Sequence, residues 1–205
     1  MRIAVLGSGH IGGTIGKKWI AVGHDVTFGV RDPGGAKMQA VLADVDGRAQ
    51  ANTIPNALAG AEAVLFAIPG TAMAETVQAN GQALDGKLLI DATNNMSHAP
   101  AYSAVDVLKK YAPGAQVYRA FNSLGWENFA DPVIDGVQAD LFFCGPQQAR
   151  STVERLIAEV GLRPIYVGDL DQVSTVDAIL PLWFQLVGPR GMPRRTAFRV
   201  LSARS

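Results

Sequence analysis

The sequence has few of the features that mark several common classes of protein. Its 205 residues include one cysteine, Cys144, which excludes an internal disulfide framework and favours a reducing compartment. No apolar run approaches the length of a membrane span, and the apolar start of the chain is too short, and too soon interrupted by Gly7, for a signal peptide. We therefore expect a cytoplasmic protein that does not interact with a membrane.

Charge of one sign and familiar catalytic motifs are also missing. The 18 Lys and Arg residues balance the 18 Asp and Glu residues, whereas a nucleic-acid-binding protein usually has a basic excess. The patterns His-x-x-x-His, Cys-x-x-Cys and Gly-x-Ser-x-Gly do not occur, so the sequence supports neither metal-dependent nor serine hydrolysis. We expect no metal site and no nucleic-acid partner.

What the sequence does have is a regular alternation of strand-like and helix-like segments. Short apolar runs cover residues 2–6, 24–28, 61–67, 87–92, 115–121, 139–145 and 162–168, and helical patterns cover 11–22, 71–83, 147–161 and 171–187. Continuous apolar strands that alternate with helices are typical of a parallel sheet covered on both faces. The predicted fold class is therefore α/β, a Rossmann-type, mainly parallel sheet with helices on both faces and a small C-terminal helical appendage.

The pattern changes after Gly145, which suggests how the chain is organised. Residues 1–145 are expected to form a nucleotide-binding domain, and residues 146–205 a small portion packed on it. Residues 188–205 contain five arginines and no acidic residue. Within this tail, residues 197–201 are predicted to form a final strand or a helical turn.

A glycine-rich loop follows the first strand. Gly7, Gly9 and Gly12 have the Gly-x-Gly-x-x-Gly spacing, and the loop opens a helix. The first glycine allows a tight turn, the second allows a pyrophosphate to approach the backbone, and the third allows close packing of helix on strand. The helix N-terminus then offers free N–H groups to the phosphates. Three further loop residues are expected to line the site, His10 mainly through its main chain: Ser8, His10 and Ile11.

The end of the second strand bears on the choice of cofactor. An NAD-binding chain usually has an acidic residue there, whereas a 2′-phosphate requires a cation. This sequence has Val30 followed by Arg31, and a guanidinium can bind phosphate through two hydrogen bonds. Asp32, before Pro33, is interpreted as a turn residue. The sequence therefore predicts NADP(H) rather than NAD(H).

Several motifs, in this order along the chain, resemble those of a known family. They are "GSGHIGG", "VRDP", "FAIP", "DATNNM", "RAFNSLGWENF", "FFCG", "GLRPIYVGDL", "AILPLWFQL" and "GMPRRTAFRVL". The chain resembles the NADP-dependent oxidoreductases of the deazaflavin coenzyme F-420, and it is also similar to the cytosolic reductase domain of six-transmembrane metalloreductases. The resemblance implies an NADP(H)-binding Rossmann domain. It also implies that the C-terminal portion completes the pocket of the second substrate and a homodimer contact.

The resemblance also assigns roles to individual residues. Gly7 to Gly12 would hold the pyrophosphate and Arg31 the 2′-phosphate, with a weaker preference for NADP because Val30 replaces a serine frequent in the family. Further cofactor contacts are implied at the ends of the later strands: Ala67, Ile68 and Pro69 near the adenine ribose and diphosphate, Thr93 and Asn94 near the nicotinamide ribose, and Ala120 and Asn122, with Phe121 between them, near the carboxamide.

The sequence thus predicts an NADP(H)-dependent oxidoreductase that transfers hydride to or from a flavin-like molecule, with coenzyme F-420 as the partner that the resemblance implies. A flavin-like partner requires no protein acid at its reacting carbon, and His98 is the candidate for a proton-transfer role. Two alternatives remain open. A proton donor such as His98 or Tyr102 beside the nicotinamide would favour a reductase of a small imine or carbonyl compound. A nicotinamide face covered by Trp126 or Phe129 would favour a non-enzymatic NADPH sensor.

Overall fold

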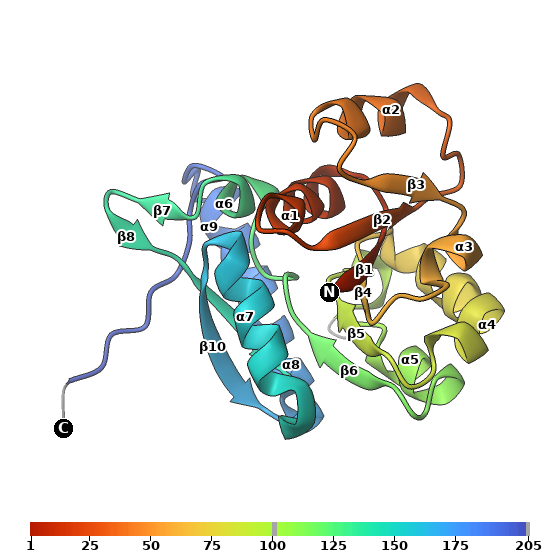
Figure 1. Cartoon of the computed structure of the whole chain (residues 1–205). Coiled ribbons are helices and arrows are strands. Elements are labelled where there is room, and N and C mark those ends of the chain that lie inside the picture. Colours follow the sequence, from red (N-terminus) through yellow and green to blue (C-terminus); the bar gives the residue numbers. More distant parts are fainter. Residues whose placement is uncertain (100–101, 204–205) are drawn as a thin grey trace.

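The computed structural model describes residues 1–99 and 102–203, and it is built around one large β-sheet (Figure 1). Over these described residues, the sheet has eight strands, in the order β10-β9-β6-β5-β4-β1-β2-β3. Their bounds are β1 (Arg2–Leu6), β2 (Asp25–Gly29), β3 (Gln50–Asn52), β4 (Ala63–Phe66), β5 (Leu88–Asp91), β6 (Gln116–Arg119), β9 (Asp140–Cys144) and β10 (Arg163–Gly168). A separate hairpin is formed by β7 (Val133–Ile134) and β8 (Val137–Gln138).

The sheet consists of two parallel blocks that run in opposite directions. The strands β3, β2, β1, β4, β5 and β6 are parallel to one another. The chain winds outward from β1 to β3 and then returns to β4 on the other side of β1, so the direction of winding reverses between β1 and β4. Strands β9 and β10 are parallel to each other, but β9 meets β6 in antiparallel fashion through the single pair Arg119–Cys144. Because these two residues are the last of their strands, most of β9 extends beyond the carboxyl end of β6.

Helices cover both faces of the sheet, as expected from the continuous apolar strands (Figure 1). They are α1 (His10–Ala21), α2 (Ala36–Ala43), α3 (Ile54–Leu58), α4 (Met73–Leu84), α5 (Val105–Tyr111), α6 (Trp126–Ala130), α7 (Arg150–Val160), α8 (Val173–Asp177) and α9 (Ile179–Val187), with short 3-10 turns η1 (Gly70–Ala72), η2 (Met96–His98), η3 (Gln147–Ala149) and η4 (Leu170–Gln172).

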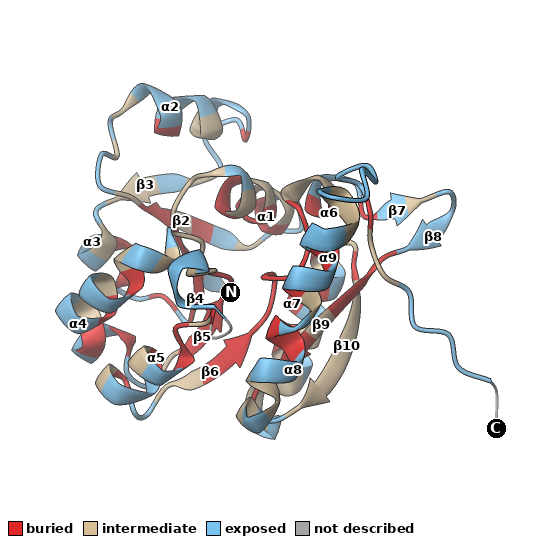
Figure 2. Cartoon of the chain, turned by 180° about the vertical axis from the view of Figure 1, so that it is seen from behind, coloured by how far each residue is buried: buried red, intermediate tan, exposed pale blue. Residues whose placement is uncertain are grey.

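Two hydrophobic cores lie on the two faces of the sheet. Neighbouring residues of β1 point to opposite sides, so that Val5 joins the core containing Trp19 of α1, and Leu6 joins the core containing Val77 of α4. Buried residues concentrate in the strands and the inner sides of the helices, whereas the C-terminal tail is exposed (Figure 2). The Rossmann-type fold predicted from the sequence is confirmed.

Two expectations for the C-terminal part are wrong in detail. The helix expected over residues 171–187 is two helices that meet at Ala178. Pro181 explains the break, because its ring clashes with the carbonyl of the residue four positions earlier, here Asp177. Residues 197–201 form neither a strand nor a helical turn. They run extended, and the N–H of Asp140 donates to the carbonyl of Phe198 over 2.9 Å.

Other elements were not anticipated. The short strand β3, the helices α2, α3, α5 and α6, and the β7–β8 hairpin have no strong apolar pattern of their own. The domain boundary at residue 145 stays a prediction, and it falls between β9 and β10, which are neighbours in the same sheet. In the part of the chain that the structure describes, no helix is long and apolar enough to cross a membrane.

Candidate dinucleotide-binding site

The predicted site residues follow the carboxyl ends of parallel strands. Because β2, β1, β4, β5 and β6 run in the same direction, the loops that follow them gather along one edge of the sheet. In open α/β sheets, ligands bind at this edge, where the winding reverses. The reversal falls between β1 and β4, next to the glycine loop.

Two glycines of the loop are required by the protein itself. Gly7 has a φ of +102°, and a Cβ there would lie 2.5 Å from the carbonyl oxygen of Ala67. A Cβ on Gly12 would lie 2.2 Å from the carbonyl oxygen of Gly7. These distances are too short for any side chain. Gly7 and Gly12 therefore allow the loop to turn tightly and α1 to pack closely on β1.

Gly9 is different, because no contact among the described residues requires a glycine there. Its φ of −69° is accessible to any residue, and a Cβ built on it meets no atom of residues 1–99 or 102–203 within 4 Å. Gly9 is the residue that caps α1, whose first N–H groups have no partner within the helix. A glycine here leaves the backbone open to a group from outside the chain. This is the position at which a dinucleotide site needs close approach of the pyrophosphate.

The end of β2 presents an exposed cation. Arg31 is exposed, and no acidic side chain of the described residues lies within 4.0 Å of its guanidinium. The side chain of Asp32 instead folds back toward Gly35, whose Cβ would lie 2.5 Å from Asp32 Oδ2. The N–H of Gly35 donates to the Asp32 carbonyl over 3.3 Å. Arg31 is thus the charge that faces outward, and Asp32 belongs to the turn.

The loops after β4 and β5 are packed against each other. A Cβ on Gly70 would lie 2.5 Å from the backbone nitrogen of Asn95. Gly70 is therefore needed not only for the turn after Pro69 but also because the loop after β5 passes too close to leave room for a side chain. Pro69 itself is exposed, whereas Ala67 and Ile68 are partly buried beside Gly7.

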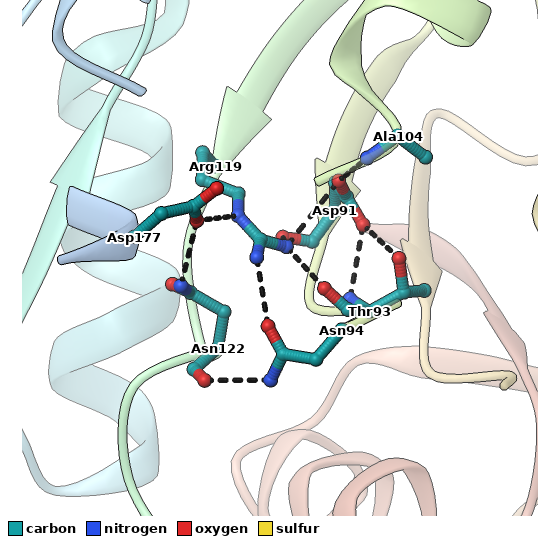
Figure 3. A network of polar contacts seen from close by, with 7 residues as sticks. All are labelled: Asp91, Thr93, Asn94, Ala104, Arg119, Asn122 and Asp177. Atoms are coloured by element: carbon teal, nitrogen blue, oxygen red, sulfur yellow. Dashed lines mark hydrogen bonds and ion pairs between the residues drawn. The ribbon is translucent and has the colours of Figure 1, made fainter. Parts of the chain in front are cut away.

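A buried arginine occupies the centre of the β5 and β6 ends (Figure 3). Arg119, the last residue of β6, has no exposed surface. Its Nε donates to Asp177 Oδ1 over 2.7 Å, and its Nη1 lies 3.3 Å from Asp91 Oδ2. Its Nη1 and Nη2 also bind the β5 loop, through the carbonyl of Thr93 and through Asn94 Oδ1 at 2.8 Å. One guanidinium therefore joins β5, β6 and α8.

The asparagines of the two loops complete this cluster (Figure 3). Asn94 Nδ2 donates to the carbonyl of Asn122 over 2.8 Å, and Asn122 Nδ2 donates to Asp177 Oδ1 over 3.1 Å. Asn122 is 1% exposed, and its Oδ1 has no hydrogen-bond partner among the described residues. An unpaired amide oxygen at the end of β6 is a free acceptor at the expected carboxamide position.

Asp91 fixes the β5 loop. Its Oδ1 accepts from the N–H and the hydroxyl of Thr93, and its Oδ2 accepts from the N–H of Ala104 over 2.7 Å. Burial raises the pKa of the other carboxyl, Asp177, although Arg119 opposes this shift. The hydroxyl of Thr93 is thus engaged inside the protein, and Thr93 is 2% exposed.

Arg119 and Asp177 were missed in the sequence. Arg119 lies within an apolar run that reads as an ordinary strand, and Asp177 lies 58 positions later within an apolar-rich helix. A charge inside a buried strand is a signal that a partner must exist, because an uncompensated buried charge is costly. The sequence does not indicate which acidic residue is the partner of Arg119.

The aromatic residues fall into two groups. Phe121 and Phe129 are fully buried, and their rings meet edge to face at 5.7 Å. Trp126 is half-buried and stacks on His10 at the start of α1, with ring centroids 4.8 Å apart and planes inclined by 17°. Phe129 is thus a core residue rather than a cover for the site, and Trp126 lies against the glycine loop.

The remaining predicted residues differ in accessibility. His98 is exposed in η2, where its N–H donates to the carbonyl of Asn95 over 3.1 Å. Tyr102 is 9% exposed. Ser8, Ile11 and Asn94 are partly buried, and Ala120 is fully buried. The cofactor roles of all these residues, and the proton-transfer role of His98, stay predictions.

A groove of about 370 Å³ lies elsewhere, between the β7–β8 hairpin and the C-terminal tail. Its lining includes Val137, Met192 and Phe198, and it contains no residue of the glycine loop or of the Arg119 cluster. The candidate site is therefore assigned from the strand ends and their chemistry rather than from cavity volume.

Fold and loop together define a Rossmann-type dinucleotide-binding domain, and comparisons with known proteins agree. The family model described as "NADP oxidoreductase coenzyme F420-dependent" matches residues 2–95. The F420-dependent NADP reductase of Methanothermobacter thermautotrophicus is 26% identical over 91% of this chain and 89% of its own length. The metalloreductase STEAP3 of Rattus norvegicus is 28% identical over 89% of this chain, but the chain spans only 38% of that protein.

Solved structures give the same result. A protein from Arthrobacter sp. FB24, assigned as an F420-dependent NADP reductase, has a TM-score of 0.86 and 26% identity, and the match covers 98% of this chain and 100% of that one. An imine reductase from Aspergillus terreus, solved with NADPH4, has a TM-score of 0.71 at 21% identity over 93% of this chain and 62% of that one, and this likeness shows the fold alone. The resemblance predicted from the motifs is confirmed.

Proposed function

We propose that the chain is an NADP(H)-dependent oxidoreductase whose second substrate is a flavin-like molecule, the deazaflavin coenzyme F-420. The observation that carries the proposal is Gly9, a glycine at the start of α1 that no contact in the described part of the chain requires. The family model and the similarity to reductases of nearly the same length support the choice of NADP and of the deazaflavin.

The residues at the sheet edge fit such a cofactor. The N–H groups at the start of α1 would bind the pyrophosphate, and the exposed guanidinium of Arg31 would donate to the 2′-phosphate. At the other end, Asn94 and Asn122 would hold the nicotinamide half, Asn122 through the acceptor Oδ1. Bound NADPH supplies a hydride. The chain's contribution is to hold the two reacting rings at the right distance and to exclude water.

The test is a comparison of acceptors. Purified protein is mixed with NADPH and, in separate reactions, with oxidised coenzyme F-420, with FMN, and with a panel of imines and carbonyl compounds, and the loss of nicotinamide absorbance is followed. We expect turnover with the deazaflavin. Turnover with imines or carbonyls alone would assign the chain to that class of reductase. Tight NADPH binding without turnover in any reaction would identify a sensor.

The choice of NADP over NAD depends on Arg31. Replacing Arg31 with Ala removes a charge-assisted contact to the 2′-phosphate, so we expect the preference for NADPH over NADH to fall by about tenfold or more. Lys37→Ala, which removes an exposed cation from α2, is the matched control. An unchanged preference in Arg31→Ala, measured from the dissociation constants of both cofactors, would show that another residue selects the phosphate.

A further inference from the structure

The Arg119 cluster lies at one end of the candidate site, far from Arg31. In the sheet order, Arg31 follows β2 and the cluster follows β5 and β6, with β1 and β4 between them. Neighbouring strands are about 4.8 Å apart, so β2 and β5 are separated by about 14 Å. This span suits an extended dinucleotide with its phosphate-bearing adenosine at Arg31 and its nicotinamide at the cluster.

The cluster fixes the orientation of both asparagines. A guanidinium can only donate, so Asn94 must turn its Oδ1 toward Arg119 Nη2 and its Nδ2 toward the carbonyl of Asn122. An ionised carboxylate can only accept, so Asn122 must turn its Nδ2 toward Asp177. The Oδ1 of Asn122 is left as the unpaired atom. The direction in which Asn122 offers an acceptor is therefore set by Asp177.

Asp177 reaches this cluster from a separate part of the chain. It is the last residue of α8, it is 2% exposed, and its Oδ1 receives both Arg119 Nε and Asn122 Nδ2. Asp91, the other acid beside Arg119, is already bound by the N–H and hydroxyl of Thr93 and by the N–H of Ala104. Loss of the Asp177 carboxylate would remove the charged acceptor of Arg119 Nε and of Asn122 Nδ2 at the same time, leaving Arg119 held only from the side of the β5 loop.

We propose that Asp177 is a positioning residue for the nicotinamide half of the cofactor: through Arg119 and Asn122 it holds the β5 and β6 loops in the geometry that receives this half. The inference rests on the proposed NADP(H) function and deepens it. It links the C-terminal portion of the chain, through α8, to a site built by the N-terminal strands.

The experiment compares two ligands on the same protein. NADPH contacts both ends of the site, whereas adenosine 2′,5′-bisphosphate contains only the phosphate-bearing adenosine half. We expect Asp177→Asn to weaken NADPH binding by about tenfold, because it removes a charged hydrogen-bond acceptor, and to change the affinity for the bisphosphate by less than about twofold. Arg31→Ala is expected to weaken both ligands. Asp171→Asn makes the same chemical change at an exposed position close in the chain, and it should alter neither affinity.

A second variant guards against loss of the fold. Asp177→Glu retains the charge but displaces the carboxylate, and it should give the same selective loss for NADPH, by several-fold, with the bisphosphate affinity as evidence that the Rossmann portion is intact. An equal loss for both ligands, or no loss for either, in whichever variant folds would overturn the inference. The inference would also be overturned if the wild-type protein bound NADPH no more tightly than the bisphosphate, because the nicotinamide half would then add nothing to binding. A wild-type protein that binds neither ligand would instead refute the proposed function.

Discussion

The two blocks of the sheet are held together in different ways. Within the block from β3 to β6, neighbouring strands share ladders of backbone hydrogen bonds, whereas β6 and β9 share the single pair Arg119–Cys144. At that junction, side-chain charges also join the two parts, because Arg119 binds Asp177 of α8. The comparison teaches that ladders of backbone hydrogen bonds join the strands of the parallel block, while at the β6–β9 junction a buried ion cluster adds to the shared apolar core that attaches the C-terminal part.

The largest expected effect follows from breaking that cluster. Arg119→Met would leave Asp91 and Asp177 buried without their shared cation, and we expect the free energy of unfolding to fall by about 3–5 kcal/mol. The control is Arg195→Met, which removes an exposed ion pair with Asp131 and should cost less than about 1 kcal/mol. Urea denaturation measures both. A loss below about 1 kcal/mol for Arg119→Met would mean that packing alone holds the junction.

The next largest effect is expected on NADPH binding. It distinguishes a glycine that the fold of the parallel block requires from one that only a bound ligand would require. Gly9→Ala places a methyl group where the protein has open space, so the melting temperature should not change. The methyl group would obstruct a pyrophosphate, and NADPH binding should weaken by about tenfold or more.

Two other alanine variants calibrate this result. Gly12→Ala should destabilise the fold by about 1–3 kcal/mol as well as impair binding, because its Cβ would lie 2.2 Å from the Gly7 carbonyl. Gly13→Ala, whose Cβ would lie 3.4 Å from the carbonyl oxygen of Ser8, should neither destabilise the fold nor impair NADPH binding. Calorimetry with NADPH and thermal melting measure the two properties. Normal NADPH affinity in Gly9→Ala would show that no ligand passes close to this residue.

The smallest expected effect is on the pH dependence of the free energy of unfolding, to which two carboxyl groups should contribute with opposite signs. Burial raises the pKa of Asp177 above its usual value of 3.8. Stability from such a group is present below the unfolded pKa and is lost as the pH rises through the folded pKa. The stability difference between the wild type and Asp177→Asn should therefore change in favour of the variant as the pH rises above 3.8.

Glu127 should behave in the opposite way. Burial acts to raise its pKa, but the hydrogen bond from Arg194, a backbone hydrogen bond at Glu127 and the charges of Arg194 and His10 together outweigh burial and hold the pKa below 4.5. Stability from this group is present above the unfolded pKa and is lost as the pH falls through the folded pKa. The wild-type advantage over Glu127→Gln should thus shrink on acidification. Urea titrations from pH 3 to about pH 7 test both signs, and parallel slopes for the two variants would contradict the assignment of the charged partners.

The parts of the fold that could be predicted from the sequence are those with a strong local pattern. Apolar runs mark the long strands, and the helix ending at Gly161 has this glycine in the left-handed conformation, as its C-cap position implies. Strand β3 and helix α3 are too short to have a period of their own, and tertiary packing decides them. The break at Ala178 could have been predicted from the sequence, because Pro181 is incompatible with an uninterrupted helix over residues 171–187.

The residues of the candidate site also differ in whether a local sequence pattern predicts them. Gly7, Gly9, Gly12 and Arg31 follow a local spacing and could be placed from the sequence. The Arg119–Asp177 pair joins residues 58 positions apart and is decided by how the chain returns to the sheet. Local chemistry predicts which loops form the site, and only the assembled fold shows what holds them in position.

Phe121 connects the site to the interior. This bulky residue has a φ of +61°, a conformation that residues other than glycine seldom adopt. Its ring contacts Trp19 and Phe129 edge to face, and the indole N–H of Trp19 donates to the carbonyl of Leu156 over 2.9 Å. Aromatic packing therefore compensates the backbone strain. Position 121 therefore has two opposing requirements: glycine would relax the backbone but leave the core unfilled, whereas a side chain large enough to fill the core must accept the positive φ.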